Sequence, residues 1–330
     1  MTICYNDNID TYVLGHGGEK IADTLYISDL DGTLLNSDAQ VSAESAKLIN
    51  AAIDKGIRFT FATARSVYSA APITSAININ VPCILMNGVS VYDLKTDTYI
   101  KNEYIPPSAS CEIIKAFKES GLECFMYKIH GGVLTCYYTE ITERVMQSFA
   151  EVRRNRYNKP FVKCRDLADE ADGETVYFTI IDSRERLLPV KDAAERIAEL
   201  DFAFYQDTYT EKWYLEIFSA NASKKNGIEF LCRQYGFDRV VSFGDNLNDL
   251  PMFARSDLKI AVANAKDEVK NAADFITLSN EQDGVAKWLA DNIKVIPHRA
   301  CAEDALSDFS SDCIEIPQAY YRMSRDFCAR

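Results

Sequence analysis

Two carboxylates stand two positions apart in the segment DLDGT at residues 29–33. Side chains at i and i+2 of a strand end point to the same side, so Asp29 and Asp31 can share one small site. Gly32 allows the chain to turn sharply away directly afterwards. This arrangement suits a nucleophile beside an acid, although a short acidic segment is equally typical of a plain turn or strand cap.

A second acidic segment, GDNLND at residues 244–249, follows an apolar run at 239–243. It adds Asp245 and Asp249 to another predicted strand end, so several acids are expected to converge. Such a cluster is electrostatically costly unless a hard cation neutralises it, and Mg²⁺ prefers carboxylate, carbonyl and water oxygens. We therefore expect a Mg²⁺ site, with an Asn/Asp-rich surface turn as the competing interpretation.

One lysine and one threonine complete the set of candidate groups. Lys224 lies at the start of a predicted helix, where a cation is unfavourable for the helix dipole unless an anion binds at the same end. Phosphate meets that requirement, and the hydroxyl of Thr63 can donate to a phosphate oxygen. A solvated surface lysine, with Lys225 as a possible substitute, and a simple helix-capping threonine are the alternatives.

Short apolar strands precede these polar segments. We predict strands at 24–28, 57–62 and 83–86, and a helix that Ser42 caps and Gly56 ends. Strand–helix–strand repeats of this length imply a parallel sheet with right-handed crossovers, in which ligands gather at the carboxyl ends of the strands.

The pattern changes in the middle of the chain, where an α+β insert is predicted. We expect helices at 110–120 and 186–200 and strands at 124–127, 133–138, 175–182, 202–205 and 213–218. The βα pattern returns with a helix from Ser223 to a stop at Gly236. The expected division is therefore a core at 1–105 and 215–294, a cap at 106–214, and an extension at 295–330 in which we interpret no motif.

Length and composition fit this organisation and exclude several classes of protein. The 330 residues, 47% hydrophobic and 26% charged, suit a globular chain of about two domains. No apolar run approaches the roughly 20 residues of a membrane span. A net charge of −13 opposes nucleic-acid binding. The ten cysteines form no C-x-x-C pair, and no basic segment precedes an apolar one at the N-terminus, so we expect reduced thiols and a cytoplasmic location.

Taken in order, DLDGT at 29–33, TAR at 63–65, Lys224 and GDNLND at 244–249 resemble the haloacid dehalogenase superfamily and, more narrowly, its Cof-type hydrolases. Similarity in MNGVSVYD (86–93) and NAKDEVKNAADFIT (264–277) extends the match to roughly residues 22–290. The resemblance implies an α/β fold, with a Rossmann-like parallel-sheet core and an inserted α+β cap. It also implies Mg²⁺-dependent phosphatase activity on small phosphorylated metabolites.

The resemblance also assigns roles to individual residues. Asp29 corresponds to the nucleophile, Asp31 to the general acid/base, Thr63 to a phosphate ligand and Lys224 to the stabilising cation. The implied metal ligands are Asp29, Asp31 through its backbone carbonyl, Asp245 and Asp249. Ala64 and Lys225 stand where the family usually has glycine, which weakens assignment to a substrate subgroup.

Five further residues are candidates for substrate binding. Arg65, Asn87 and Asn248 lie beside the core motifs. Lys128 and His130 lie in the segment 127–132, which joins two predicted strands and whose tip we expect to face the active site. An exposed hairpin turn with solvated side chains is the competing interpretation of that segment.

Two other functions use similar residues. A phosphomutase shares the phospho-aspartate chemistry but returns the phosphoryl group to a sugar. A non-enzymatic phospho-acceptor resembling response-regulator receivers also places acids, a threonine and a lysine at strand ends, but it needs neither Asp31 nor a cap-sized insert. The sequence identifies neither the substrate nor the oligomeric state.

Overall fold

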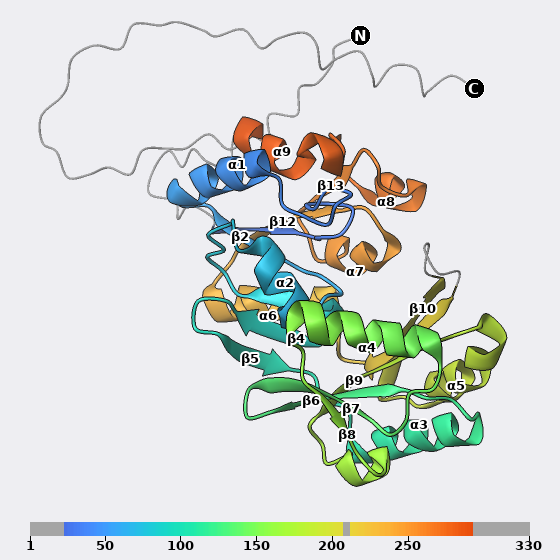
Figure 1. The fold of residues 1–330 in the computed structure, drawn as a ribbon. Helices are drawn as coiled ribbons and strands as arrows, with labels where there is room; N and C mark the ends of the chain where they lie inside the picture. The colour runs from blue at the N-terminus through green and yellow to red at the C-terminus, as the bar shows by residue number, and fades with distance from the viewer. Residues whose placement is uncertain (1–22, 207–211, 293–330) are drawn as a thin grey trace, which may run out of the picture. The chain divides into compact units, whose positions relative to one another are not determined.

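The computed structural model describes residues 23–206 and 212–292 (Figure 1). The N-terminal 20 residues and the predicted extension at 295–330 lie outside the described residues. None of the helices in the described ranges combines the length and apolar character needed to span a bilayer.

A five-stranded parallel sheet, here called the core sheet, has the order β14-β13-β12-β1-β2. Its strands are β1 (Thr24–Ser28), β2 (Arg58–Phe61), β12 (Arg239–Gly244), β13 (Leu258–Val262) and β14 (Phe275–Thr277). β1 and β12 are neighbours although they are far apart in the sequence, so the chain leaves this sheet and returns to it. The strand order reverses direction at β1, which is the place where ligands bind in sheets of this kind.

Helices cover both faces of the core sheet. α1 (Ala43–Asp54) and α9 (Gly284–Asn292) lie on one side, and α6 (Lys224–Tyr235) and α7 (Leu250–Phe253) lie on the other (Figure 1). As predicted, Ser42 caps α1 by accepting a hydrogen bond from the Ser45 amide, and α6 ends at Gly236, whose φ is 75°. Glycine adopts this left-handed conformation without the steric cost of a Cβ.

A six-stranded sheet, here called the cap sheet, has the order β10-β11-β9-β6-β7-β8. Its strands are β6 (Phe125–His130), β7 (Val133–Tyr138), β8 (Phe161–Lys163), β9 (Thr175–Asp182), β10 (Leu200–Gln206) and β11 (Trp213–Ser219). α3 (Pro107–Glu119) and α5 (Arg184–Arg196) pack with the buried residues Phe178, Leu215 and Ile217 on one face. α4 (Arg144–Tyr157) packs on the opposite face, where Phe149 stacks on Phe125 with ring centres 5.3 Å apart.

A small antiparallel sheet, β3-β4-β5, adjoins the core sheet. Its strands are β3 (Cys83–Leu85), β4 (Ser90–Asp93) and β5 (Thr98–Asn102). The sequence predicted Cys83–Met86 as a further strand of the parallel sheet. In the structure one parallel bridge, between Ala62 and Ile84, makes that connection, and the remaining pairing of β3 is antiparallel with β4.

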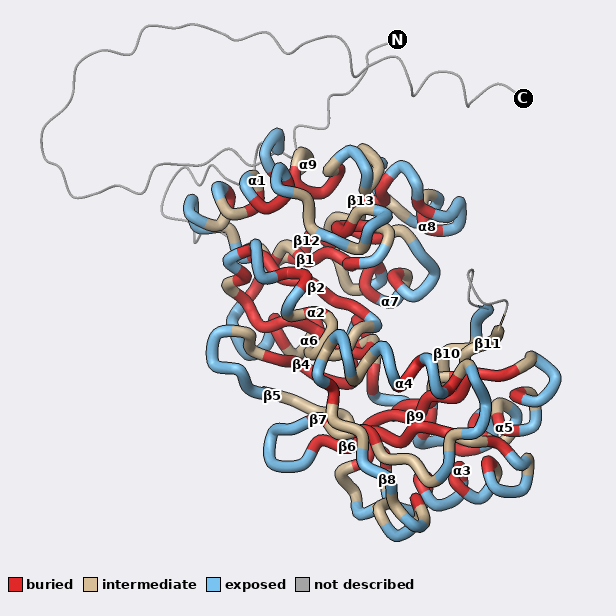
Figure 2. The backbone as a smooth tube through the Cα atoms, viewed as in Figure 1, coloured by how far each residue is buried: buried red, intermediate tan, exposed pale blue. Residues whose placement is uncertain are grey.

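Short elements complete the described fold. They are α2 (Val67–Thr74), α8 (Asp267–Ala272) and the 3₁₀ turns Met86–Gly88, Leu167–Glu170, Leu247–Asp249 and Asn280–Gln282. Buried residues concentrate along the central strands of both large sheets (Figure 2). The predicted fold class, a parallel-sheet core with an inserted α+β cap, is confirmed. The division at residues 106 and 214 stays a proposal, and β11 extends the cap sheet to Ser219.

Candidate active site

The polar segments after three core strands meet at one edge of the core sheet. Asp29 follows β1, Thr63 follows β2, and Asp245 follows β12. Parallel strands bring their carboxyl ends to the same edge, so these segments converge although the sequence separates them widely. The first residue of α6, Lys224, reaches the same place.

Asp29, Lys224 and Asp249 form a buried charged cluster. The Lys224 ammonium donates to Asp29 Oδ1 at 2.5 Å and to Asp249 Oδ1 at 2.7 Å, and its side chain is 1% exposed. The second oxygen of Asp249 accepts hydrogen bonds from the Asp245 and Asn246 amides at 2.9 and 3.0 Å. Buried charges require this kind of pairing, because unpaired charges in the interior are strongly destabilising.

Three carboxylates of this edge can share a cation. Oxygens of Asp29, Asp245 and Asp249 all lie within 4.8 Å of one another. An all-oxygen, largely buried donor set of this kind fits Mg²⁺, which is a hard cation and also keeps several waters. Asp31 does not contribute its side chain to this group.

The pKa values of these acids follow from their burial. Burial raises the pKa of Asp29, with Lys224 opposing and the neighbouring acids adding to the shift. Burial also raises the pKa of Asp245 to about 6, against the hydrogen bond from Thr33. A divalent cation among these groups would favour their ionised forms. The acid cluster is therefore electrostatically suited to a cation.

Two glycines let the backbone approach the acids closely. A Cβ on Gly32, whose φ is 78°, would lie 2.5 Å from Asp245 Oδ2. A Cβ on Gly244 would lie 2.7 Å from the Asp249 Cβ. Any larger residue at either position would have to displace a candidate metal ligand.

Asp31 has different surroundings from Asp29. Its carboxylate forms a two-point ion pair with Arg65, at 2.7 Å from Nε and 2.5 Å from Nη2, and its side chain is 52% exposed. The two acids of the DLDGT segment therefore separate into a buried one beside Lys224 and an accessible one beside Arg65.

The remaining core candidates lie close to this edge. Thr63 is buried, and its carbonyl accepts from the Asn87 amide at 2.9 Å. Asn248 Nδ2 lies 3.4 Å from Asn87 Oδ1. Met86 and Asn87 both have left-handed backbones, with φ of 51° and 56°, a conformation that costs energy in residues other than glycine and is frequent at functional sites.

The two candidates in the cap, Lys128 and His130, pair with acids of the cap and not with residues of the core sheet edge. Lys128 is buried and pairs with Asp172 at 2.6 Å, and His130 is exposed beside Glu174 at 2.7 Å. Neither lines the cavity between Arg65 and the cap sheet. Alternate residues of a strand face opposite sides, and Tyr127 rather than Lys128 faces this cavity.

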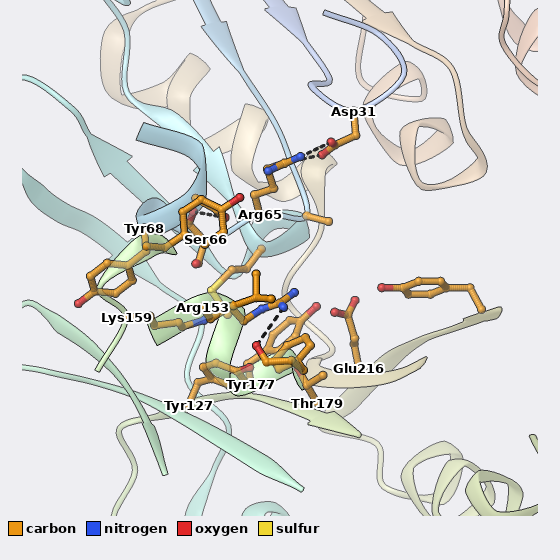
Figure 3. A pocket seen from close by; sticks show the side chains of 17 residues that line it. Asp31, Arg65, Ser66, Tyr68, Tyr127, Arg153, Lys159, Tyr177, Thr179 and Glu216 are labelled. Carbon is orange, nitrogen blue, oxygen red and sulfur yellow. Dashed lines mark hydrogen bonds and ion pairs between the residues drawn. The ribbon is translucent and has the colours of Figure 1, made fainter. Parts of the chain in front are cut away.

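A cavity of about 360 Å³ lies between the Asp31–Arg65 pair and the cap sheet (Figure 3). Its cap side carries residues that no sequence motif predicted as site residues: Tyr127, Arg153, Lys159, Tyr177, Thr179, Tyr205 and Glu216. Tyr177 and Thr179 are polar residues two positions apart in one predicted strand, so they lie on the same face of the sheet. This alternation is the sequence feature from which the cavity-facing side of the cap sheet could have been predicted.

The chain has an α/β fold with a second sheet inserted in it, and a buried Asp–Lys–Asp cluster lies at the edge of the core sheet. This arrangement is typical of α/β enzymes whose active site lies at that edge. Residues 26–289 match the model of the haloacid dehalogenase-like hydrolases. The chain belongs to this family, as the motifs predicted.

Individual relatives agree with this assignment. The chain is 27% identical to phosphatase YwpJ of Bacillus subtilis, over 79% of this chain and 96% of the relative. It is 22% identical to pyridoxal phosphate phosphatase YbhA of Escherichia coli, over 79% and 95% of the two chains. The solved structure of TM0651 from Thermotoga maritima is 29% identical, with a TM-score of 0.68, and the match covers 82% of this chain and 97% of that one.

Proposed function

We propose that this protein is a Mg²⁺-dependent phosphatase that hydrolyses small phosphorylated metabolites through an aspartyl phosphate on Asp29. The coarser part, a phosphatase of the haloacid dehalogenase-like family, is established by the family match and by relatives named as phosphatases. The metal, the intermediate and the residue roles are the proposal. The observation that carries it is the Asp29 carboxylate, held 2.5 Å from Lys224 within a cluster of three acids.

Charge is the main obstacle to this chemistry. A phosphate monoester is a dianion, and each close pair of like charges costs on the order of 4 kcal/mol at an effective dielectric constant near 20. Lys224 supplies one compensating charge beside Asp29. Mg²⁺, held by Asp29, Asp245, Asp249 and the carbonyl of Asp31, would supply positive charge at the phosphoryl oxygens.

The proposed reaction has two displacements at phosphorus. Asp29 attacks in line, a bond forms between its oxygen and phosphorus, and the bond to the leaving alkoxide breaks while Asp31 donates a proton to that alkoxide. Asp31 then removes a proton from water, which attacks phosphorus and releases Asp29 and inorganic phosphate. Thr63 donates its hydroxyl to a phosphoryl oxygen throughout.

The exposure of Asp31 supports its separate role. A general acid must reach the leaving group, and Asp31 lines the cavity, whereas Asp29 is buried and does not line it. Arg65 holds the Asp31 carboxylate in place through two contacts. Asn87 and Asn248 lie next to each other and are candidates for contact with the substrate. Lys128 and His130 do not line the cavity, and their role in substrate binding stays a prediction from the sequence alone.

A screen of phosphate esters tests this proposal. The purified protein should release inorganic phosphate in proportion to the substrate consumed, with Mg²⁺ and not with excess chelator. A phosphomutase would instead give an isomeric phosphate ester without free phosphate. A phospho-acceptor module would become phosphorylated once per molecule and would not release phosphate repeatedly.

A further inference from the structure

A second polar cluster lies on the cap side of the cavity, away from the acids of the core sheet. It consists of Arg153 from α4, Lys159 after α4, Tyr177 from β9 and Glu216 from β11. Figure 3 shows these side chains facing the cavity from the cap sheet and α4, across from Asp31 and Arg65. None of the four takes part in the phosphoryl chemistry proposed above.

Three members of this cluster have a buried polar group without a hydrogen-bond partner among the described residues: Lys159, Tyr177 and, at its Oε2, Glu216. Lys159 is 7% exposed, and within residues 23–206 and 212–292 its ammonium has no hydrogen bond or ion pair and lies only over the Tyr127 ring, 4.1 Å from its centre. Tyr177 is 3% exposed, and in the same ranges its hydroxyl has no hydrogen-bond partner. Leaving buried polar groups unpaired is costly, so these groups indicate that a ligand completes the site, with an anionic group for Lys159 and Tyr177 and a hydroxyl donor for Glu216 Oε2.

The charges of the cluster indicate what kind of ligand. Arg153 and Lys159 supply two cations, and Glu216 supplies one carboxylate, so a positive charge remains in excess. Arg65, at the opposite end of the cavity, is already paired with Asp31. Burial lowers the pKa of Lys159 to about 7, and a bound anion would keep its ammonium protonated.

The size of the cavity sets the size of the ligand. About 360 Å³ is at the small end of the range for metabolite pockets. A phosphoryl group at the Asp31 end therefore leaves room for the leaving group of a small metabolite to reach the cluster.

We propose that Lys159, Arg153 and Tyr177 bind a second anionic group, a carboxylate or a phosphate, at the far end of the leaving group. The substrate class is then phosphate monoesters of acidic metabolites. This inference rests on the proposed phosphatase function and narrows it.

A matched pair of substrates tests the proposal. Phosphogluconate and sorbitol phosphate, each phosphorylated at the terminal carbon, differ in having a carboxylate or a hydroxymethyl group at the opposite end. A second pair, fructose bisphosphate and fructose monophosphate, tests a distal phosphate instead. We expect the wild-type kcat/KM to be about tenfold or more higher for at least one anionic member than for its neutral partner, equivalent to about 1.4 kcal/mol.

Variants of Lys159 identify the responsible group. Lys159→Met should remove this preference, chiefly through KM, and leave sorbitol phosphate and the activated ester p-nitrophenyl phosphate within about threefold of wild type. Lys159→Arg should restore part of the preference. Lys163→Met, at an exposed position of the cap sheet, is the control that should change nothing. Thermal melting of each variant checks that the fold is retained.

Two results would overturn the proposal: no preference for either anionic member in the wild type, or an equal loss on all substrates in Lys159→Met. If even p-nitrophenyl phosphate is not hydrolysed, the phosphatase function itself fails. Calorimetric binding of the same pairs to the wild-type and Lys159→Met proteins then decides the anion site separately. Tighter binding of the anionic members that depends on Lys159 supports the site, and equal binding contradicts it.

Discussion

At the scale of single residues, the site gives two neighbouring carboxylates opposite surroundings. Asp29 is buried against Lys224, whereas Asp31 is accessible and paired with Arg65. Attack on phosphorus requires a carboxylate held in one position, and proton transfer requires one that reaches the leaving group. The local geometry therefore supports the proposed division of roles between Asp29 and Asp31.

Replacing Asp31 tests that division. Asp31→Asn should slow the hydrolysis of sugar phosphates by about 10²- to 10⁴-fold, because the poor alkoxide leaving group then departs without a proton. Aryl phosphates, whose leaving groups need no proton, should lose much less in the first step. Steady-state and burst kinetics on both ester classes measure the difference. Equal losses on both classes in the first step would remove Asp31 from the role of acid.

The burial of Lys159 predicts how the stability of the protein depends on pH. Its pKa in the folded protein is about 7, below the ordinary value of 10.5, chiefly because of burial. Between these values the unfolded chain binds more protons, so the contribution of Lys159 to the free energy of unfolding rises with pH. The free energy of unfolding of the wild type should therefore increase relative to that of Lys159→Met between pH about 7 and about 8.5.

Urea unfolding of both proteins at the two pH values measures this difference. The charged and titratable groups that influence Lys159 are Cys136, Arg153 and Glu216, and Tyr127 lies against its ammonium. Burial raises the pKa of Cys136 to about 12, so its thiol stays protonated throughout the window. A difference that stays constant or shrinks as the pH rises would contradict the assignment.

The sequence allowed the core residues of the site to be predicted better than the cap residues. Asp29, Asp245 and Asp249 follow strands of one parallel sheet, and parallel strands bring such residues together whatever the detail of the fold. The cap residues depend instead on which face of a strand each occupies. The pairing register of β6 with β9 shifts between Tyr127 and Lys128, and a shift of this kind is not readable from composition or spacing.

At the scale of elements, the tight turn after β1 determines how closely the acids approach. Gly32→Ala should raise the Mg²⁺ concentration needed for half-maximal activity, because its Cβ would lie 2.5 Å from Asp245 Oδ2. Both this variant and the control Gly236→Ala should lose about 1 kcal/mol of stability from left-handed strain. Titration of activity with Mg²⁺ separates the two effects.

Gly236 is a close match for this control. Its φ is 75° against 78° for Gly32, and a Cβ there would meet nothing within 4 Å. Gly236→Ala should therefore keep the wild-type Mg²⁺ requirement. Equal Mg²⁺ requirements in the two variants would show that the turn does not control the metal site.

Element prediction succeeded where caps and apolar runs agree, and it failed where strand pairing depends on a turn whose backbone conformation the sequence does not indicate. Ser42 and Gly236 mark helix ends through local hydrogen bonding and backbone conformation, which the sequence encodes directly. The β3 run looks like the buried strands before it, and its antiparallel pairing with β4 follows from the turn at Met86–Gly88. The left-handed Met86 in that turn has no sequence signal of its own.

At the scale of the whole molecule, the site joins segments from both ends of the described chain. The Lys224 ammonium contacts both Asp29 and Asp249. A Mg²⁺ ion bound by these two acids would therefore link the two parts of the core sheet. Saturating Mg²⁺ should therefore stabilise the folded state, by about 2.7 kcal/mol at a hundred times its Kd. Thermal melting with and without Mg²⁺ measures this without any substrate.

Two variants make that measurement specific. Asp245→Ala should lose most of the Mg²⁺-dependent stabilisation, since it removes one ligand. Asp54→Ala, at an exposed position at the end of α1, should keep it. A Mg²⁺ effect that persists unchanged in Asp245→Ala would place the cation elsewhere.

The most direct test of the central claim is to trap the phosphoenzyme. Asp31→Asn, in which hydrolysis of the intermediate should be slow, is mixed with an aryl phosphate, whose leaving group needs no proton, and with Mg²⁺, then quenched in acid, reduced with borohydride and digested. An aspartyl phosphate is reduced to homoserine, so mass spectrometry of the peptides locates the modified residue. We predict homoserine at position 29, and none when Asp29→Asn is added to the variant. Homoserine at another position, or turnover with no trapped residue at all, would contradict the account.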